Sequence, residues 1–236
     1  MSGKPIPSNE RLIFAMDVPS CEQAMALSEE LGESVTFYKL GLELMMSGGY
    51  FELMKWMLER DKKVFADLKF FDIPATVGSA VRQLKDRGAS FVTVHGNQSI
   101  MEAAAENKGD DLKILAVTVL TSLDRGDLDD LGFDCDVEAL VVSRARRALE
   151  AGCDGVISSG LEAPMLREHI GEKLLIVTPG IRPVENRPSE DQKRVVTVEE
   201  AFANGADYIV VGRPIRDAES PRGAAESIQQ TIAALT

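Results

Sequence analysis

Histidine and cysteine are scarce in this chain, which has two histidines and three cysteines among its 236 residues. A metal site with three histidine ligands is therefore excluded, and only His95 or His169 is available to a catalytic triad. The cysteines, Cys21, Cys135 and Cys153, are widely spaced and form no Cys-x-x-Cys pair, which argues against a disulfide framework and a structural zinc site. Unpaired cysteines are typical of a reducing compartment, so we expect a cytoplasmic protein.

The chain also lacks a long apolar run and a surplus of positive charge. No segment approaches the roughly 20 apolar residues that span a bilayer, and residues 1–10 contain no apolar run of signal-peptide length. Lys and Arg number 26 against 38 Asp and Glu, so the net charge of −12 makes the surface repel nucleic acids and anionic membranes. We expect neither as a partner, and an anionic small-molecule substrate would need a locally positive pocket.

Eight short apolar or β-branched runs alternate with longer amphipathic stretches. Their starts are about 28 residues apart, which suits a strand, a helix and two short loops. The predicted strands are residues 12–17, 35–40, 64–69, 91–95, 113–119, 154–158, 174–178 and 207–211. The predicted helices are the stretch between Ser20 and Gly32 and residues 49–60, 74–87, 99–107, 137–151, 161–169, 197–204 and 221–235.

Eight strand–helix units without a Pro-rich or Ser-rich linker predict a single (β/α)8 TIM barrel, one domain over residues 1–236, close to the usual size of about 250 residues. An open doubly wound sheet is the alternative, although the first strand is followed by no Gly-x-Gly-x-x-Gly loop. Two connections, 120–136 and 179–196, are long, and we expect lids or binding loops there. The acidic cluster at 127–130 is interpreted as a solvated loop or turn without calcium-binding spacing.

The third strand carries charges that a buried strand normally avoids. Asp67 and Lys69 are two residues apart, so on a regular strand they share a face, and Asp72 follows in the loop. Such charges are costly among apolar residues unless they pair, and a purely structural ion pair is one explanation. The other is catalysis: a lysine between two carboxylates stays protonated and suits proton donation better than imine formation, unless Lys39 lies close enough to offset them.

Two glycine–arginine loops follow the last two strands, Pro179-Gly180-Ile181-Arg182 after the seventh and Gly212-Arg213-Pro214 after the eighth. In a barrel of this kind the loops after strands 7 and 8 recurrently bind phosphate through backbone N–H groups and arginine. The alternative is simple turn glycines with solvated arginines. The pattern thus favours a phosphorylated small molecule at the C-terminal end of the barrel.

Together these segments resemble the orotidine 5′-phosphate decarboxylase family. The motif Asp67-x-Lys69-x-x-Asp72-Ile73-Pro74-x-Thr76 is similar to its signature, and the similarity continues through residues 15–17, 38–41, 119–122, 179–182 and 212–214. A related metal-dependent 3-keto-gulonate 6-phosphate decarboxylase group shares the Asp-x-Lys-x-x-Asp part and remains the alternative. A nonenzymatic phosphoribosyl-ligand sensor is a weaker one, since it would not need the three charged residues.

The resemblance implies decarboxylation of orotidine 5′-monophosphate (OMP) to UMP and CO2 without a metal or organic cofactor. It implies a charged network of Lys39, Asp67, Lys69 and Asp72, in which Lys69 protonates C6 of the pyrimidine. Asp72 would come from the partner subunit of a homodimer with shared active sites.

The resemblance also assigns the substrate. Asp17 and Lys39 would contact the ribose, Thr121 or Ser122 the pyrimidine, and Gln192 both base and phosphate. The full set of substrate-binding residues that it implies is Asp17, Lys39, Asp67, Ile73, Thr76, Thr121, Ser122, Pro179, Arg182, Gln192, Gly212 and Arg213.

Overall fold

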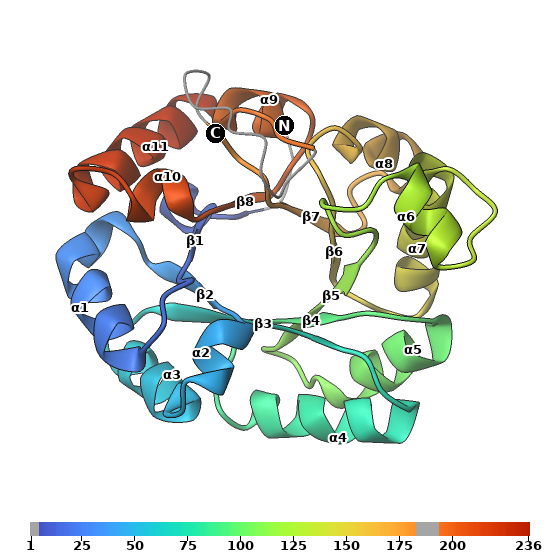
Figure 1. Cartoon of the computed structure of the whole chain (residues 1–236), viewed down its shortest axis with the longest axis horizontal. Coiled ribbons are helices and arrows are strands. Elements are labelled where there is room, and N and C mark those ends of the chain that lie inside the picture. Colours follow the sequence, from blue (N-terminus) through green and yellow to red (C-terminus); the bar gives the residue numbers. More distant parts are fainter. Residues whose placement is uncertain (1–4, 183–193) are drawn as a thin grey trace.

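The computed structural model describes residues 5–182 and 194–236, and its centre is a closed barrel of parallel strands in the order β1 to β8 (Figure 1). β8 pairs with β1, so the sheet has no free edge. The prediction of a (β/α)8 barrel is confirmed. The strands are β1 (Leu12–Ala15), β2 (Phe37–Leu40), β3 (Lys63–Phe70), β4 (Phe91–Val94), β5 (Lys113–Val117), β6 (Gly155–Ile157), β7 (Leu175–Thr178) and β8 (Tyr208–Val211).

Helices surround the barrel, and those anticipated from periodicity form within a few residues of their predicted ends. They are α1 (Cys21–Leu31), α3 (Tyr50–Leu58), α4 (Pro74–Lys85), α5 (Gln98–Asn107), α7 (Val137–Glu150), α8 (Ala163–Ile170), α9 (Val198–Ala203) and α11 (Pro221–Leu235). Shorter helices that periodicity did not reveal are α2 (Leu42–Met46), α6 (Arg125–Asp130), α10 (Arg213–Arg216) and the 3-10 turns η1 (Ser8–Glu10) and η2 (Gly32–Ser34). None of the helices in the described part of the chain is long and apolar enough to cross a membrane.

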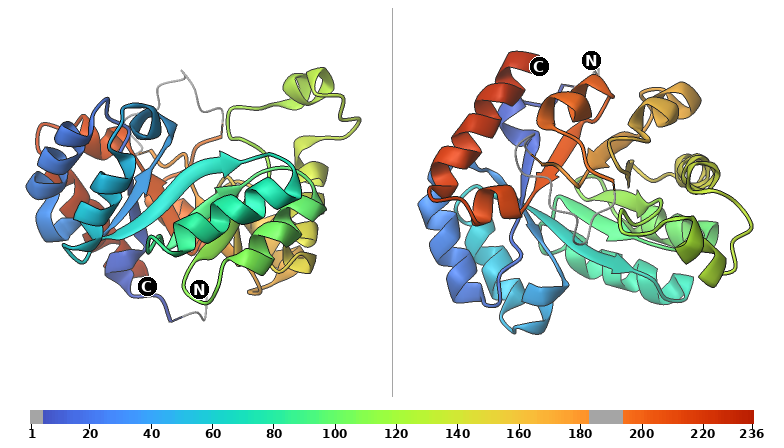
Figure 2. Two further views of the ribbon diagram at one scale, coloured as in Figure 1. Left: turned by 90° about the horizontal axis from the view of Figure 1, so that it is seen from below. Right: turned by 45° about the horizontal axis from the view of Figure 1, so that its top comes forward.

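The interpretation of residues 127–130 as a loop or turn was wrong, because these acids belong to α6. Asp124 caps this helix by accepting bonds from the backbone N–H groups of Gly126 and Asp127, and the Asp127 side chain accepts from the N–H of Asp124 in return. A reciprocal capping box satisfies N–H groups that otherwise lack partners in the first turn. The left view of Figure 2 shows α6 standing clear of the ring of longer helices.

Two apolar clusters hold the barrel together. One fills the space between the strands and the helix ring. The other fills the barrel interior with bulky side chains, among them Phe37, Phe65, Phe91 and Tyr208, with the Phe37 and Phe91 ring centroids 4.9 Å apart. Because these side chains fill the barrel interior, a ligand of the barrel would bind above them, at the C-terminal ends of the strands.

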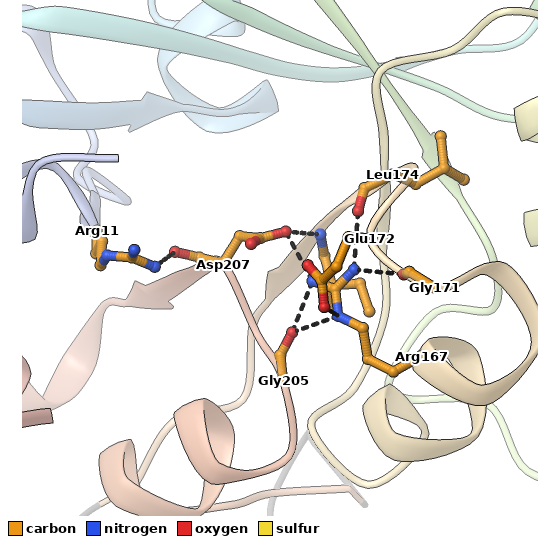
Figure 3. A network of polar contacts seen from close by, with 8 residues as sticks. Arg11, Arg167, Gly171, Glu172, Leu174, Gly205 and Asp207 are labelled. Carbon is orange, nitrogen blue, oxygen red and sulfur yellow. Dashed lines mark hydrogen bonds and ion pairs between the residues drawn. The ribbon is translucent and has the colours of Figure 1, made fainter. Parts of the chain in front are cut away.

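The N-terminal end of the barrel is closed by a buried ionic network (Figure 3). Asp207, just before β8, is fully buried, and its Oδ2 accepts bonds from Arg167 Nη2 at 2.8 Å and from the N–H of Ile176 at 2.9 Å. Arg11 donates to the backbone carbonyl of Asp207. Asp154, just before β6, repeats the arrangement with Lys108 and the N–H of Ile114. These carboxylates stabilise the end of the barrel remote from the cavity described next.

Candidate active site

A cavity of about 560 Å³ opens at the C-terminal ends of the strands. Its volume lies within the range of small-molecule sites, and its position is where barrels of this kind place their active sites. Most residues predicted from the sequence to form a site line it, although they come from six strands and the segments that follow them. These are Asp17, Lys39, Asp67, Lys69, Thr121, Ser122, Pro179, Arg182, Gly212 and Arg213.

Four of these side chains form a chain of alternating charge along one wall. Lys39 Nζ lies 3.1 Å from Asp17 Oδ1 and 3.5 Å from Asp67 Oδ2, and Lys69 Nζ lies 2.9 Å from Asp67 Oδ1. Asp67 and Lys39 are each 13% exposed, whereas Asp17 is 48% exposed and Lys69 35%. The inner pair is therefore shielded from water, and the Lys69 ammonium reaches further into the open space.

Burial and pairing act in opposite directions on the inner pair. Burial lowers the pKa of Lys39, but the carboxylates of Asp67 and Asp17 outweigh it and leave that pKa raised. Burial raises the pKa of Asp67, but Lys39 and Lys69 outweigh it, helped by hydrogen bonds, and leave that pKa lowered. Both groups are thus charged at neutral pH, and the wall presents fixed charges to a ligand.

The opposite wall is cationic. In the closed strand order β7 lies across the barrel from β3, and the segments after β7 and β8 bring Arg182 and Arg213 to the cavity beside Gly180 and Gly212. Gly180 has φ 80°, a left-handed conformation that glycine adopts without steric cost. Two guanidinium groups beside two glycines that line the cavity suit a phosphate, so the acidic protein contains the local positive surface that an anionic ligand needs.

Sequence reasoning missed Arg216, which also lines the cavity. Its Nη1 donates to the backbone carbonyl of Asp17 at 2.7 Å, and its Nε and Nη2 bind the carboxylate of Asp217 at 2.7 and 3.1 Å. The spacing of three residues from Arg213, which places both on one side of a helix, is the signal that would have found it. Arg216 ties the segment after β8 to the segment after β1.

The loop after β5, which carries Thr121 and Ser122 into the cavity, is held by two arginines that the sequence did not reveal. Arg144 of α7 donates to the carbonyl of Thr118. Arg194 donates to the carbonyl of Leu120 at 2.8 Å and pairs with the buried Glu162 at 2.5 Å. Three connections of the barrel therefore meet at this buried ion pair beside the cavity.

The other predicted site residues lie elsewhere. Asp72, Ile73 and Thr76 do not line the cavity; Asp72 is exposed, and its Oδ1 accepts a bond from the N–H of Ile73 at 2.6 Å. Among the described residues of one chain, only Asp67 forms an ion pair with Lys69, so the idea of a lysine flanked by both carboxylates does not hold within a single subunit. Gln192 lies outside the described residues.

Nothing in the described ranges forms a group of three or more His, Cys, Asp and Glu side chains arranged to hold a metal ion. The polar side chains that line the cavity carry ammonium, carboxylate, hydroxyl and guanidinium groups.

Comparison with known proteins agrees with this geometry. The sequence model of the orotidine 5′-phosphate decarboxylase / HUMPS family matches residues 10–228. The chain is 66% identical over 232 residues to the orotidine 5′-phosphate decarboxylase of Methylococcus capsulatus, an alignment that covers 98% of this chain and 96% of that one. It is 51% identical to the enzyme of the same name from Stenotrophomonas maltophilia, covering 99% and 98%. The crystal structure of orotidine 5′-phosphate decarboxylase from Lactobacillus acidophilus is similar with a TM-score of 0.84 and 34% identity, covering 94% and 99%.

Proposed function

The chain belongs to the orotidine 5′-phosphate decarboxylase / HUMPS family, and from this premise we propose how its cavity works. The enzyme decarboxylates OMP to UMP and CO2, the last step of pyrimidine nucleotide synthesis. The observation that carries the proposed mechanism is the row of charges from Asp17 to Lys69 on one wall, with arginines on the other.

The substrate lies across the cavity in this proposal. Its phosphate binds Arg182 and Arg213 beside Gly212, and its ribose hydroxyls contact Asp17 and Lys39. The pyrimidine then lies over Lys69, with Thr121 and Ser122 at its edge. Binding of the remote phosphate contributes free energy that aligns the reacting carbon with the ammonium.

The chemical step requires stabilisation of negative charge at C6 and one proton for that carbon. The bond between C6 and the carboxylate breaks, both electrons stay on C6, and CO2 leaves. The Lys69 ammonium stabilises the developing negative charge and then transfers a proton to C6, which gives UMP and a neutral amine that regains its proton from solvent. Asp67, itself paired with Lys39, holds this ammonium in place before the reaction starts, so no reorganisation is needed as charge develops.

Replacement of the ammonium tests this mechanism. Lys69→Ala should lower kcat for OMP by about 10⁴-fold or more, since it removes both proton donor and electrostatic stabilisation, yet it should still bind UMP. Lys63→Ala is the matched control, because Lys63 lies at the opposite end of the same strand and pairs with Glu10 at 2.6 Å. Decrease of OMP absorbance and titration with UMP are the measurements, and near-normal turnover by Lys69→Ala would refute the role.

The assay is run with and without a chelator, which separates this chemistry from the metal-dependent keto-sugar phosphate reaction. OMP turnover that survives the chelator supports cofactor-free decarboxylation. Turnover that depends on a divalent ion favours the alternative. A cytoplasmic location, which we also propose, agrees with Cys21, Cys135 and Cys153 all being free.

We further propose a homodimer in which each subunit completes the active site of the other. The segment after β3 supports it, because Phe71 and Ile73 are 70% and 66% exposed although both are apolar. They flank Asp72, which is exposed and does not line the cavity of its own chain. A second copy seated here would bury the apolar pair and bring Asp72 toward the Lys69 of its partner.

Mixed dimers test this arrangement. Lys69→Ala and Asp72→Ala proteins should each be nearly inactive, but a mixture that exchanges subunits should recover roughly a quarter of the wild-type sites, because each heterodimer has one site with both groups intact. Light scattering checks the assembly. A mixture that stays inactive although heterodimers form would contradict the shared site.

A further inference from the structure

The most unusual backbone beside the cavity is in β3. Its register against β4 shifts between Ala66 and Phe70, so that residues 67–69 lie opposite the single β4 residue Thr93. Extra residues on one strand make a β-bulge, which bends the strand and re-aims its side chains. In this bulge Lys69 has φ 46°, a left-handed conformation that residues other than glycine rarely adopt.

A single hydroxyl group connects the ends of the bulge. The backbone N–H of Lys69 donates to Thr93 Oγ1 at 2.9 Å, where a regular ladder would supply a carbonyl. Thr93 Oγ1 donates to Asp67 Oδ1 at 2.9 Å, and Lys69 Nζ donates to the same oxygen at 2.9 Å. One residue of β4 therefore contacts both the carboxylate of Asp67 and the backbone of Lys69.

The chemistry of these groups determines the donor and the acceptor in each hydrogen bond of the Thr93 hydroxyl. A backbone N–H can only donate and an ionised carboxylate can only accept, so the hydroxyl of Thr93 must accept the first bond and donate the second. Thr93 is fully buried, which leaves no water to replace either bond if the hydroxyl is removed. A left-handed backbone at a residue with a side chain persists only where its surroundings enforce it, and Thr93 provides that constraint.

We propose that Thr93 is a positioning residue for the decarboxylation: its hydroxyl holds the bulge and orients Asp67 so that the Lys69 ammonium points into the cavity. Thr93 does not line the cavity, so its effect on the reaction passes through these two residues. The inference rests on the proposed function, because it presumes that Lys69 is the proton donor.

Two substitutions separate the hydroxyl from the rest of the side chain. Thr93→Val keeps the shape and removes both hydrogen bonds, and we expect kcat for OMP to fall about 10²-fold while the Kd for UMP changes by less than about threefold. Thr93→Ser keeps the hydroxyl and should retain kcat within about fivefold of wild type. Thr178→Val is the matched control, since Thr178 is equally buried at the end of β7 and its Oγ1 has no hydrogen-bond partner among the described residues.

Each outcome decides between explanations. Circular dichroism and thermal unfolding establish that the variants are folded, and the rescue by Thr93→Ser remains informative if Thr93→Val is unstable. The role is overturned if Thr93→Val keeps kcat within about threefold of wild type, or if Thr93→Ser or Thr178→Val loses as much kcat as Thr93→Val. Wild-type protein that fails to convert OMP would overturn the proposed function and this inference together, whereas active wild type with active Thr93→Val would overturn this inference alone.

Discussion

Asp207 offers a test of how the barrel is stabilised at the end away from the substrate. The substitution Asp207→Asn keeps an oxygen that can accept from the N–H of Ile176 but removes the negative charge beside Arg167 (Figure 3). The guanidinium of Arg167 is 13% exposed and retains carbonyl partners at Gly171, Leu174 and Gly205. Asp207→Asn therefore leaves a largely buried cation without its carboxylate.

The magnitude follows from burial. Removal of one partner of a buried ion pair costs about 3–5 kcal/mol, and the remaining carbonyls, with Glu172 at 3.6 Å, place this case near the lower end, at about 3 kcal/mol. Asp154→Asn is the matched control, because Asp154 and Lys108 form the same arrangement but are 25% and 20% exposed. Solvent screens that pair, so its loss should cost about 1 kcal/mol.

Equilibrium unfolding in urea and thermal denaturation measure both variants. We expect Tm to fall by about 6–12 °C for Asp207→Asn and about 2–4 °C for Asp154→Asn, given the usual relation for a chain of this size. OMP turnover at 25 °C should stay close to wild type, since both networks lie at the N-terminal end of the barrel and the cavity at the other. Equal losses of stability in the two variants would refute the argument that burial sets the difference.

Two further predictions concern the cavity. Glu162→Gln or Arg194→Met alone should destabilise the protein by about 3 kcal/mol in urea unfolding, because each change leaves a buried charge without its partner. The double variant should lose less stability than the sum of the two single losses, and additive losses would argue against direct coupling. Burial raises the pKa of Asp67, but the ion pairs with Lys39 and Lys69 outweigh burial, so the pKa is lowered in the folded protein. The contribution of the Asp67 carboxylate to stability is therefore present above the unfolded pKa of about 3.9 and is lost as pH falls through the folded pKa. The stability of wild type relative to Asp67→Asn should thus rise from about pH 3 to about pH 5 and stay level above that, and a difference independent of pH over the lower range would contradict the lowered pKa.

The regular elements were predictable because they depend on local pattern. Apolar runs of strand length alternating with amphipathic stretches placed all eight strands, and glycine at positions such as Gly32 and Gly152 placed helix ends. The short helices α2, α6 and α10 were not predicted, because one or two turns contain too few residues to show a helical periodicity in the sequence. Their formation depends on capping contacts such as that of Asp124, which the structure makes visible.

The site was predictable in composition and only partly in geometry. The position of a charged residue at the end of a strand suffices to direct it toward the C-terminal mouth of the barrel, which is why Asp17, Lys39 and Asp67 were found. Lys69 does reach the cavity, but through a bulge with a left-handed backbone rather than through the alternation of a regular strand. That path depends on a hydroxyl from β4, a contact between residues 24 apart in sequence.

By itself, the amino-acid sequence determined the class of fold, the third-strand motif and the cationic loops, because each of these is set by residues close together in the chain. Only the tertiary structure decided that Thr93 bonds to the third strand, that Arg194 and Glu162 join three connections, and that Asp72 does not line the cavity of its own chain. The physical reason is that strand register, the direction of a bulge and the burial of an ion pair are properties of segments distant in sequence that meet only when the barrel closes.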